Sequence, residues 1–388
     1  MIYLDNAATT KIDEAVLGAM QPYLGDFYGN MGSLHSKGRE AYNAVQNARK
    51  QVADFINASP KQIIFTSGGT EANNMVINNA MLMPCKSRIV TSKAEHESIL
   101  KSVKNASNYG KMETWILPVL SSGSLDLDHA VDAILNKTNA QSIAVASFMR
   151  ANNELGSLNP IWEIGELCSE LYIPFHTDCV QAAGFSEIDV KKFKCDYLTI
   201  SSHKIHGPKG VGALYVKEPK MFKPLIHGGD SQEFGLRGGT ENIAGIVGFG
   251  KACEIAMNTM AENQYKIRES RDAFKSNLRY NMACLGLSDI LHFNSIANKI
   301  INVRFDGIPS ESLLMVLDSQ GVCVSAGSAC NASDGKPSHV LKAIGLTDEQ
   351  AKSSIRVSFS KYNTEAESIE AAKIFANCVK TLYNIHVS

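Results

Sequence analysis

Residues 63–74 read IIFTSGGTEANN, and this stretch indicates the fold. Four residues with strand character, 63–66, run into a Ser-Gly-Gly turn, and a helix is expected from about Glu71. The same change from a short apolar run to an amphipathic stretch recurs along the first two thirds of the chain. Further strands are predicted at residues 89–91, 142–149, 173–178 and 197–202. This alternation predicts an α/β fold with a mostly parallel central sheet covered by helices on both faces.

The pattern changes after about residue 258. Four apolar residues, spaced by seven, seven and four positions, form one face of a long helix: Met260, Ile267, Phe274 and Leu278. We interpret this helix as the link to a second, smaller unit. The elements predicted there are a strand at 300–305, a helix after Pro309, a strand at 354–359 and a last helix started by a capping box at 364–367.

Composition and charge exclude several classes of protein. Of the 388 residues, 44% are apolar and 20% are charged, which is typical of a soluble globular protein. Lys and Arg (38) nearly balance Asp and Glu (39), so no direct binding to nucleic acid or membrane is expected. We expect no signal peptide, and no apolar run approaches the ~20 residues that cross a bilayer. The nine cysteines lack paired spacing, which indicates reduced thiols and a cytoplasmic protein.

Polar side chains follow several predicted strands, at the edge where parallel sheets bind ligands. The turn at residues 67–70 could hold an anion, since glycines and free N–H groups at a helix start attract phosphate. Such turns also join strands to helices without any ligand. Asp178 ends another strand, where an acid is often only a helix cap, and Gln181 follows it. We therefore expect a site at this edge, with its ligand left open.

Residues 201–207 read SSHKIHG and end a further predicted strand with a lysine. Most lysines are solvated surface charges, so Lys204 is unusual at a sheet edge between Ser, His and Gly. His203 and His206 have a spacing that could suggest zinc. The lysine between them and the lack of a third nearby ligand argue against it, and no metal site is predicted.

Cys330 lies in a segment of small and polar residues in the C-terminal third of the chain. Residues 324–335 read VSAGSACNASDG, which predicts an exposed and mobile loop. An accessible thiol in such a loop can be reactive, although a loop cysteine can also have no role. The residues alone leave both interpretations open.

Taken in chain order, these motifs resemble those of the cysteine desulfurases of the NifS/IscS type, in the class V aminotransferase group of fold-type I pyridoxal 5'-phosphate (PLP) enzymes. The resemblance runs nearly from end to end. Its motifs are YLDNAATT (3–10), SGGTEANN (67–74), NNELG (152–156), HTD (176–178) with Gln181, SSHK (201–204), GLRGGTEN (235–242), the loop of Cys330 with PSHVL (337–341), and SIR (354–356). Many motifs in one order are far more specific than any one of them.

The resemblance implies a role for each candidate residue. Lys204 would carry PLP as a Schiff base, Asp178 would face the pyridine nitrogen, and His96 would stack on the ring. The remaining cofactor contacts would come from Gly69, Thr70, Asn153, Gln181, Ser201 and His203, with Thr240 reaching in from a second subunit of a homodimer. Arg356, with Asn153 close by, would bind the carboxylate of the substrate L-cysteine.

The implied reaction removes sulfur from L-cysteine and leaves alanine. Lys204 would take the Cα proton, and the thiolate of Cys330 would attack the substrate sulfur to form a persulfide for a sulfur-acceptor protein. Catalysis would thus rest on Lys204, Cys330 and His96. The acceptor could belong to iron–sulfur cluster assembly, tRNA thiolation or DNA sulfur modification. Two alternatives stay open, a class V aminotransferase and a non-catalytic sulfur-carrier scaffold.

The resemblance also implies two domains and shows some departures. A large PLP-binding domain would span residues 14–258, and a smaller α+β domain would combine residues 1–13 with 259–388. The chain departs from the family pattern at Met31, at Phe234 and Gly238, and in residues 228–233, where an Asp230-Ser231 insertion makes the segment one residue longer. These changes bear on the predicted position of Thr240 and on the subunit interface.

Overall fold

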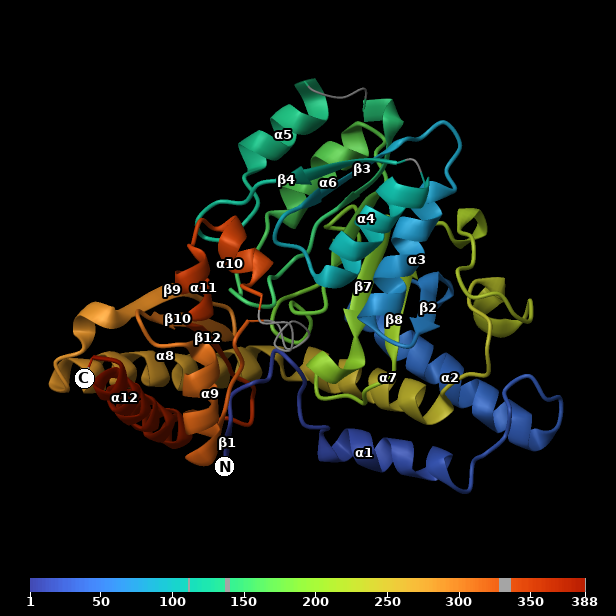
Figure 1. The fold of residues 1–388 in the computed structure, drawn as a ribbon. Helices are drawn as coiled ribbons and strands as arrows, with labels where there is room; N and C mark the ends of the chain where they lie inside the picture. Colours follow the sequence, from blue (N-terminus) through green and yellow to red (C-terminus); the bar gives the residue numbers. More distant parts are fainter. Residues whose placement is uncertain (111, 137–139, 328–335, 388) are drawn as a thin grey trace.

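A computed structural model of the chain describes residues 1–110, 112–136, 140–327 and 336–387. At its centre is a seven-stranded sheet in the order β2-β8-β7-β6-β5-β3-β4 (Figure 1). Its strands are β2 (Ile63–Thr66), β3 (Arg88–Ser92), β4 (Glu113–Leu117), β5 (Ile143–Ser147), β6 (Phe175–Asp178), β7 (Tyr197–Ser201) and β8 (Gly212–Val216). Strand β8 runs antiparallel to both of its neighbours, β2 and β7. The pairs β7–β6, β6–β5, β5–β3 and β3–β4 are parallel. The mostly parallel sheet predicted from the sequence is confirmed.

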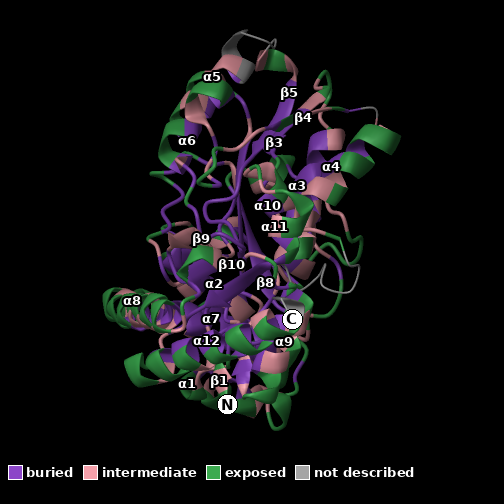
Figure 2. Ribbon diagram, turned by 60° about the vertical axis from the view of Figure 1, so that its left-hand side comes forward, coloured by how far each residue is buried: buried purple, intermediate pink, exposed green. Residues whose placement is uncertain are grey.

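Helices cover both faces of this sheet because its strands are apolar on both sides. In β2, Ile63 and Phe65 face one core and Ile64 faces the other, as the two-residue period of a strand requires. The first core packs against α2 (Ser36–Phe55), α6 (Ile161–Glu170) and α7 (Ile243–Asn258), and the second against α3 (Gly69–Met81) and α4 (Glu97–Gly110). Figure 2 shows the buried strands between these helical layers. Helix α3 starts at Gly69, two residues before the position expected from the sequence.

A second, antiparallel sheet in the order β12-β10-β9 has its own core. It consists of β9 (Leu291–Ala297), β10 (Ile300–Phe305) and β12 (Ser354–Ser358), packed against α8 (Met260–Cys284), α9 (Ser310–Ser319) and α12 (Glu365–Val387). Phe274 of α8 contacts Phe359 and Phe375 edge-on, with ring centroids 5.9 and 5.2 Å apart. Helix α8, whose apolar face the sequence predicted, extends from the large sheet to this smaller one (Figure 1).

The remaining elements are short. They are β1 (Ile2–Tyr3), β11 (Val322–Cys323), α1 (Glu14–Met20), α5 (Leu127–Asn136), α10 (His339–Ala343), α11 (Asp348–Lys352) and 3₁₀ turns at Gln21–Leu24, Pro60–Gln62, Ala140–Ser142, Ser202–Lys204 (η4), Pro219–Met221, Gln232–Gly235 (η6) and Ser288–Ile290. The capping box at the start of α12 is confirmed: Thr364 N–H donates to the Glu367 carboxyl at 3.0 Å, and Glu367 N–H donates to Thr364 Oγ1 at 3.2 Å.

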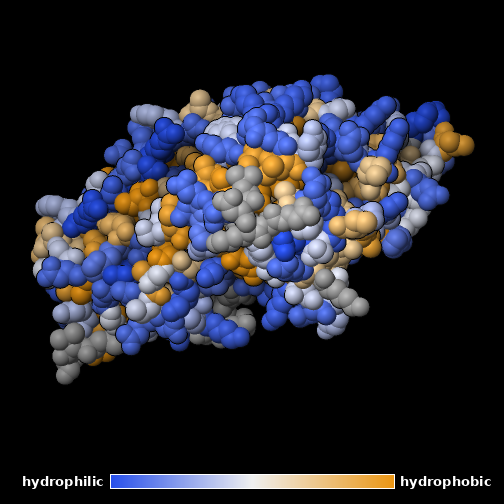
Figure 3. All heavy atoms as spheres, turned by 90° about the horizontal axis from the view of Figure 1, so that it is seen from above, coloured by the Kyte–Doolittle hydropathy of each residue, from blue (hydrophilic) through white to orange (hydrophobic). Residues whose placement is uncertain are grey.

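The outer surface is mixed in polarity. Seen from above, hydrophobic residues gather in the middle of a mostly hydrophilic face (Figure 3). None of the helices in the described ranges is both long enough and apolar enough to cross a membrane.

A buried ion pair fixes the segment that contains the insertion. Arg49 of α2 and Glu233 of η6 are 1% and 4% exposed, and their two hydrogen bonds are 2.6 and 2.8 Å long. Glu233 also accepts a hydrogen bond from Phe65 N–H of β2 at 2.7 Å. The guanidinium of Arg49 lies between the rings of Phe65 and Phe234, at 4.8 and 4.9 Å from their centroids. Glu233 and Phe234 have φ values of 41° and 60°, which this set of contacts has to hold in place.

We predict that Glu233→Ala destabilises the protein by about 3–5 kcal/mol, because it leaves the buried charge of Arg49 without a partner. The surface pair of Lys194 and Glu166 provides the control, and Glu166→Ala should cost less than about 1 kcal/mol. Urea unfolding of both variants measures the difference. Equal stability of the two variants would contradict this role for the buried pair.

Candidate active site

A cavity of about 220 Å³ lies where the carboxyl ends of β2, β3, β5, β6 and β7 face the second sheet. This is the edge at which parallel sheets bind ligands. Ten of the predicted site residues line it: Gly69, Thr70, His96, Asn153, Asp178, Gln181, Ser201, His203, Lys204 and Arg356. Residues from both halves of the chain therefore meet in one site.

Asp178 closes β6 and is held by two donors. Its carboxyl oxygens accept hydrogen bonds from Asn73 Nδ2 at 2.8 Å and from Val180 N–H at 2.9 Å. The side chain is almost fully buried but lines the cavity. A carboxyl group fixed in this way can present an oxygen to a basic nitrogen of a ligand.

A chain of hydrogen bonds connects this acid to His96. Asn73 Nδ2 also donates to Ser98 Oγ at 2.8 Å, and Ser98 Oγ lies 2.7 Å from His96 Nδ1. The backbone N–H of Ser98 donates to the same Nδ1 at 3.1 Å, so Nδ1 is an acceptor. Burial lowers the pKa of His96, with Asp178 opposing that shift. The ring is therefore neutral at pH 7, with its proton on Nε2.

Sequence reasoning missed Asn73 and Ser98 as site residues. Asn73 lies within the SGGTEANN motif and three residues after Thr70, which puts both on one helix face toward the cavity. That spacing was the available signal for Asn73. Ser98 lies two residues after His96, and only the packing of α4 against α3 brings it to Asn73.

Lys204 reaches across to the N-terminal segment. Its Nζ donates to the carbonyl oxygens of Ala7 and Ala8 at 2.5 and 2.7 Å. Gln181 Nε2 donates to the same Ala7 carbonyl at 2.9 Å, while Gln181 Oε1 is buried without a hydrogen-bond partner among the described residues. The opening YLDNAATT motif thus contributes main-chain acceptors, which no side-chain pattern reveals.

One end of the cavity suits an anion such as phosphate. Gly69 and Thr70 lie in the first turn of α3, Ser201 ends β7, and His203 follows that strand. Burial, with a smaller effect of Lys204, lowers the pKa of His203 to about 4. At pH 7 this imidazole is neutral and would bind an anion as a hydrogen-bond donor.

Arg356 reaches the site from β12 of the second sheet. Its Nη2 lies 2.8 Å from Asp5 Oδ1, and its Nη1 donates to the carbonyl oxygen of Asn153 at 2.9 Å. The side chain is only 1% exposed. Because each Nη carries two hydrogens, the guanidinium has one N–H left on each nitrogen for a ligand carboxylate.

Two predicted residues remain, Cys330 and Thr240. Cys330 falls outside the described residues, but both flanks of its segment are anchored beside the cavity. Ser325 exchanges backbone hydrogen bonds with Arg356, and Ser338 Oγ donates to Glu154 Oε2 at 2.5 Å. Thr240 is exposed and does not line the cavity.

Comparison with known proteins identifies the family. Residues 2–371 match the aminotransferase class-V family. A cysteine desulfurase IscS from Dictyoglomus turgidum is 42% identical over 371 residues, covering 94% of this chain and 91% of the relative. The chain belongs to the aminotransferase class-V family.

Solved structures of similar proteins have the same fold. A NifS-like protein superposes with a TM-score of 0.86 at 32% identity and covers 99% of both chains. The structure of SspA in complex with cysteine superposes with a TM-score of 0.78 at 32% identity and covers 94% of this chain and all of that one. The fold-type I architecture expected from the sequence is confirmed.

This class V protein depends on PLP, and the cavity fits that cofactor. Asp178 is available for the pyridine nitrogen, Lys204 for the aldehyde carbon, and the first turn of α3 for the phosphate. Three buried oxygens of lining residues, Gln181 Oε1, Asn153 Oδ1 and Asn73 Oδ1, have no hydrogen-bond partner within the described part of the chain. Such acceptors are expected where a polar ligand completes the site.

We predict that Ser98→Ala raises the pKa of His96, because the lost O–H donor stabilises only the neutral ring. Titration of ¹⁵N-labelled histidine by NMR measures this, and Ser102→Ala on the same helix is the matched control. In the unchanged protein the ring proton should be on Nε2. A His96 proton on Nδ1, or an unchanged titration in Ser98→Ala, would remove the hydrogen-bond chain from this role.

Proposed function

We propose that this class V protein is a cysteine desulfurase, which takes sulfur from L-cysteine, releases alanine and carries the sulfur as a persulfide on Cys330. The observation that carries the proposal is the anchoring of both flanks of the Cys330 segment at the cavity, through Arg356 and Glu154. The names of the relatives and the cysteine bound to SspA support the same substrate. An aminotransferase would use the same cavity but has no need of a thiol there.

Each cavity residue has a part in this reaction. When bound, PLP supplies an electron sink for the negative charge that develops at the substrate α-carbon. Asp178 would pair with the protonated ring nitrogen, and the neutral imidazole of His96 would contact the ring. Thr70, Ser201 and His203 bind the phosphate. Lys204, whose amine the carbonyls of Ala7 and Ala8 orient, takes the Cα proton and returns one later.

Arg356 sets the direction of the substrate. Its two free N–H groups would donate to the carboxylate oxygens of cysteine in a fork, beside Asn153, while Asp5 and the Asn153 carbonyl keep the guanidinium in place. The carboxylate held at one end and the cofactor at the other would fix the orientation of the substrate between them.

Sulfur transfer balances without an outside oxidant. The thiolate of Cys330 attacks the sulfur of the substrate and forms an S–S bond, while the Cβ–S bond of the substrate breaks. Its electron pair stays on the carbon fragment, which takes up protons and leaves as alanine. The sulfur thus reaches Cys330 as a persulfide, from which a thiol of an acceptor protein removes it.

The assembly and the setting complete the proposal. The protein would act as a homodimer in the cytoplasm, with Thr240 of each subunit completing the phosphate site of the other. The ion pair of Arg237 with Glu71, 2.9 Å long, ties the segment that carries Thr240 to the phosphate turn. The large and small domains would divide at residues 13/14 and 258/259, as predicted.

We expect Lys204→Ala to lose the absorbance band of lysine-bound PLP, since no other amine would replace it. Lys209→Ala, an exposed lysine in the same segment, should keep the band. Borohydride reduction followed by peptide mapping should find the cofactor on Lys204. An adduct on another lysine would show that the assignment is wrong.

For Cys330 we expect incubation with L-cysteine, without reductant, to add one sulfur atom to this residue alone. Mass spectrometry of the digested protein measures this. Cys330→Ser should gain no sulfur, whereas Cys284→Ser, at an exposed cysteine, should still gain it. Alanine should form without a keto acid. A keto-acid requirement would favour the aminotransferase, and a persulfide on another cysteine would refute the role of Cys330.

A further inference from the structure

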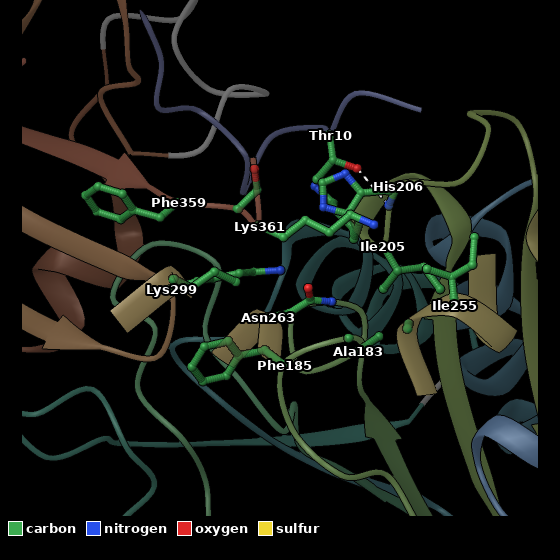
Figure 4. A pocket seen from close by; sticks show the side chains of 15 residues that line it. Thr10, Ala183, Phe185, Ile205, His206, Ile255, Asn263, Lys299, Phe359 and Lys361 are labelled. Carbon is green, nitrogen blue, oxygen red and sulfur yellow. Dashed lines mark hydrogen bonds between the residues drawn. The ribbon is translucent and has the colours of Figure 1, made fainter. Parts of the chain in front are cut away.

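A second, smaller cavity lies next to the proposed active site, and Lys204 lines both. Its volume is about 30 Å³, which is room for one or two water-sized occupants, since a water needs roughly 10–15 Å³. Lys299, just before β10, points into it together with Asn263 of α8 (Figure 4). His206 and Lys361 also line this cavity. None of the roles assigned to the active site involves this cavity.

Lys299 is buried without a partner for its charge. The side chain is 5% exposed, and within the described part of the chain no residue forms a hydrogen bond or ion pair with its Nζ. Burial alone lowers its pKa to about 8, so the amine is still mostly protonated at pH 7. An ionised amine removed from water without a counter-charge is strongly unfavourable. A counter-charge that is not part of the protein would resolve this.

The charged side chains among the described lining residues of the cavity are all basic. Its described lining includes the three lysines Lys204, Lys299 and Lys361 but no Asp or Glu. Lys361 is paired with Asp13 at 2.5 Å, and Lys204 is bound to two carbonyl oxygens. His206 is neutral, because burial lowers its pKa to about 4. Of these lysines only Lys299 lacks a partner, and the cavity is therefore a site for negative charge.

We propose that this cavity binds one small monovalent anion, of halide size, with the ammonium group of Lys299 as its main ligand. Asn263 can add a second donor, because its Nδ2 uses one hydrogen for Thr259 Oγ1 at 2.8 Å and has another free. A volume of this size suits a halide, which is only slightly larger than a water molecule. The site is also separate from the phosphate end of the larger cavity, which lies at Thr70 and Ser201.

The bound anion would change the electrostatic environment of the Lys204 amine. Its negative charge would offset that of Lys299 beside Lys204, which lines the same cavity.

Crystals of the holoenzyme grown with bromide in place of chloride test the site directly. We expect an anomalous bromide peak within hydrogen-bond distance of Lys299 Nζ. In Lys299→Met crystals grown in the same way, that peak should be absent. A cavity that holds only water, or bromide bound only elsewhere, would overturn the proposal.

Thermal unfolding gives a second readout that needs no crystals. At constant ionic strength, replacing gluconate by chloride should raise the Tm of the holoenzyme by on the order of 1–3 °C, because the anion binds only the folded state. Lys299→Met should lose this rise. Lys192→Met, at an exposed lysine paired with Glu187, should keep it and so controls for general salt effects. A rise of equal size in Lys299→Met would contradict anion binding at this residue.

Discussion

The arrangement of the site depends on the hydrogen bonds made by the buried guanidinium of Arg356. It joins β12 to Asp5 in the N-terminal segment and to the carbonyl of Asn153 after β5, three points that lie far apart in the sequence. Because the side chain is almost inaccessible to water, each of these partners has to be in place when the protein folds. The two sheets are thereby set at a fixed distance on either side of the cavity. Ala7 then becomes available as an acceptor for both Lys204 and Gln181.

The electrostatic character of the site follows from its burial. Glu95 is fully buried, and burial raises its pKa to about 8, so it is mostly protonated at pH 7. It accepts hydrogen bonds from Met149 N–H at 3.0 Å and Ser92 Oγ at 2.8 Å, which lie on two neighbouring strands or the turns that follow them. A neutral Glu95 leaves Asp178 without a second negative charge close by. Burial keeps His96 and His203 neutral in the same way.

The sequence predicted those parts that depend on local pattern. The carboxyl ends of parallel strands must converge, so side chains such as Asp178 and Lys204 could be grouped before the structure was known. Strands β4, β8 and β9 were not predicted. Strand β9 is half-buried along its whole length, so its burial does not alternate from residue to residue. Strand β8 is a short apolar run, and only its pairing with β7 reveals its direction. Asn73, Ser98 and the main-chain acceptors of the N-terminal segment were missed because their roles come from contacts between distant segments.

The ion pair of Arg49 and Glu233 also has a consequence for how this region can change in evolution. The extra residue of the 228–233 segment lies before Glu233, and Glu233 is fixed to α2 and to the backbone of β2. Insertions and deletions upstream of it can thus be absorbed in a surface turn without displacing β2 or the phosphate turn that follows. A graft of the corresponding loop from a relative should succeed only if it supplies an acid at this point, whatever its length.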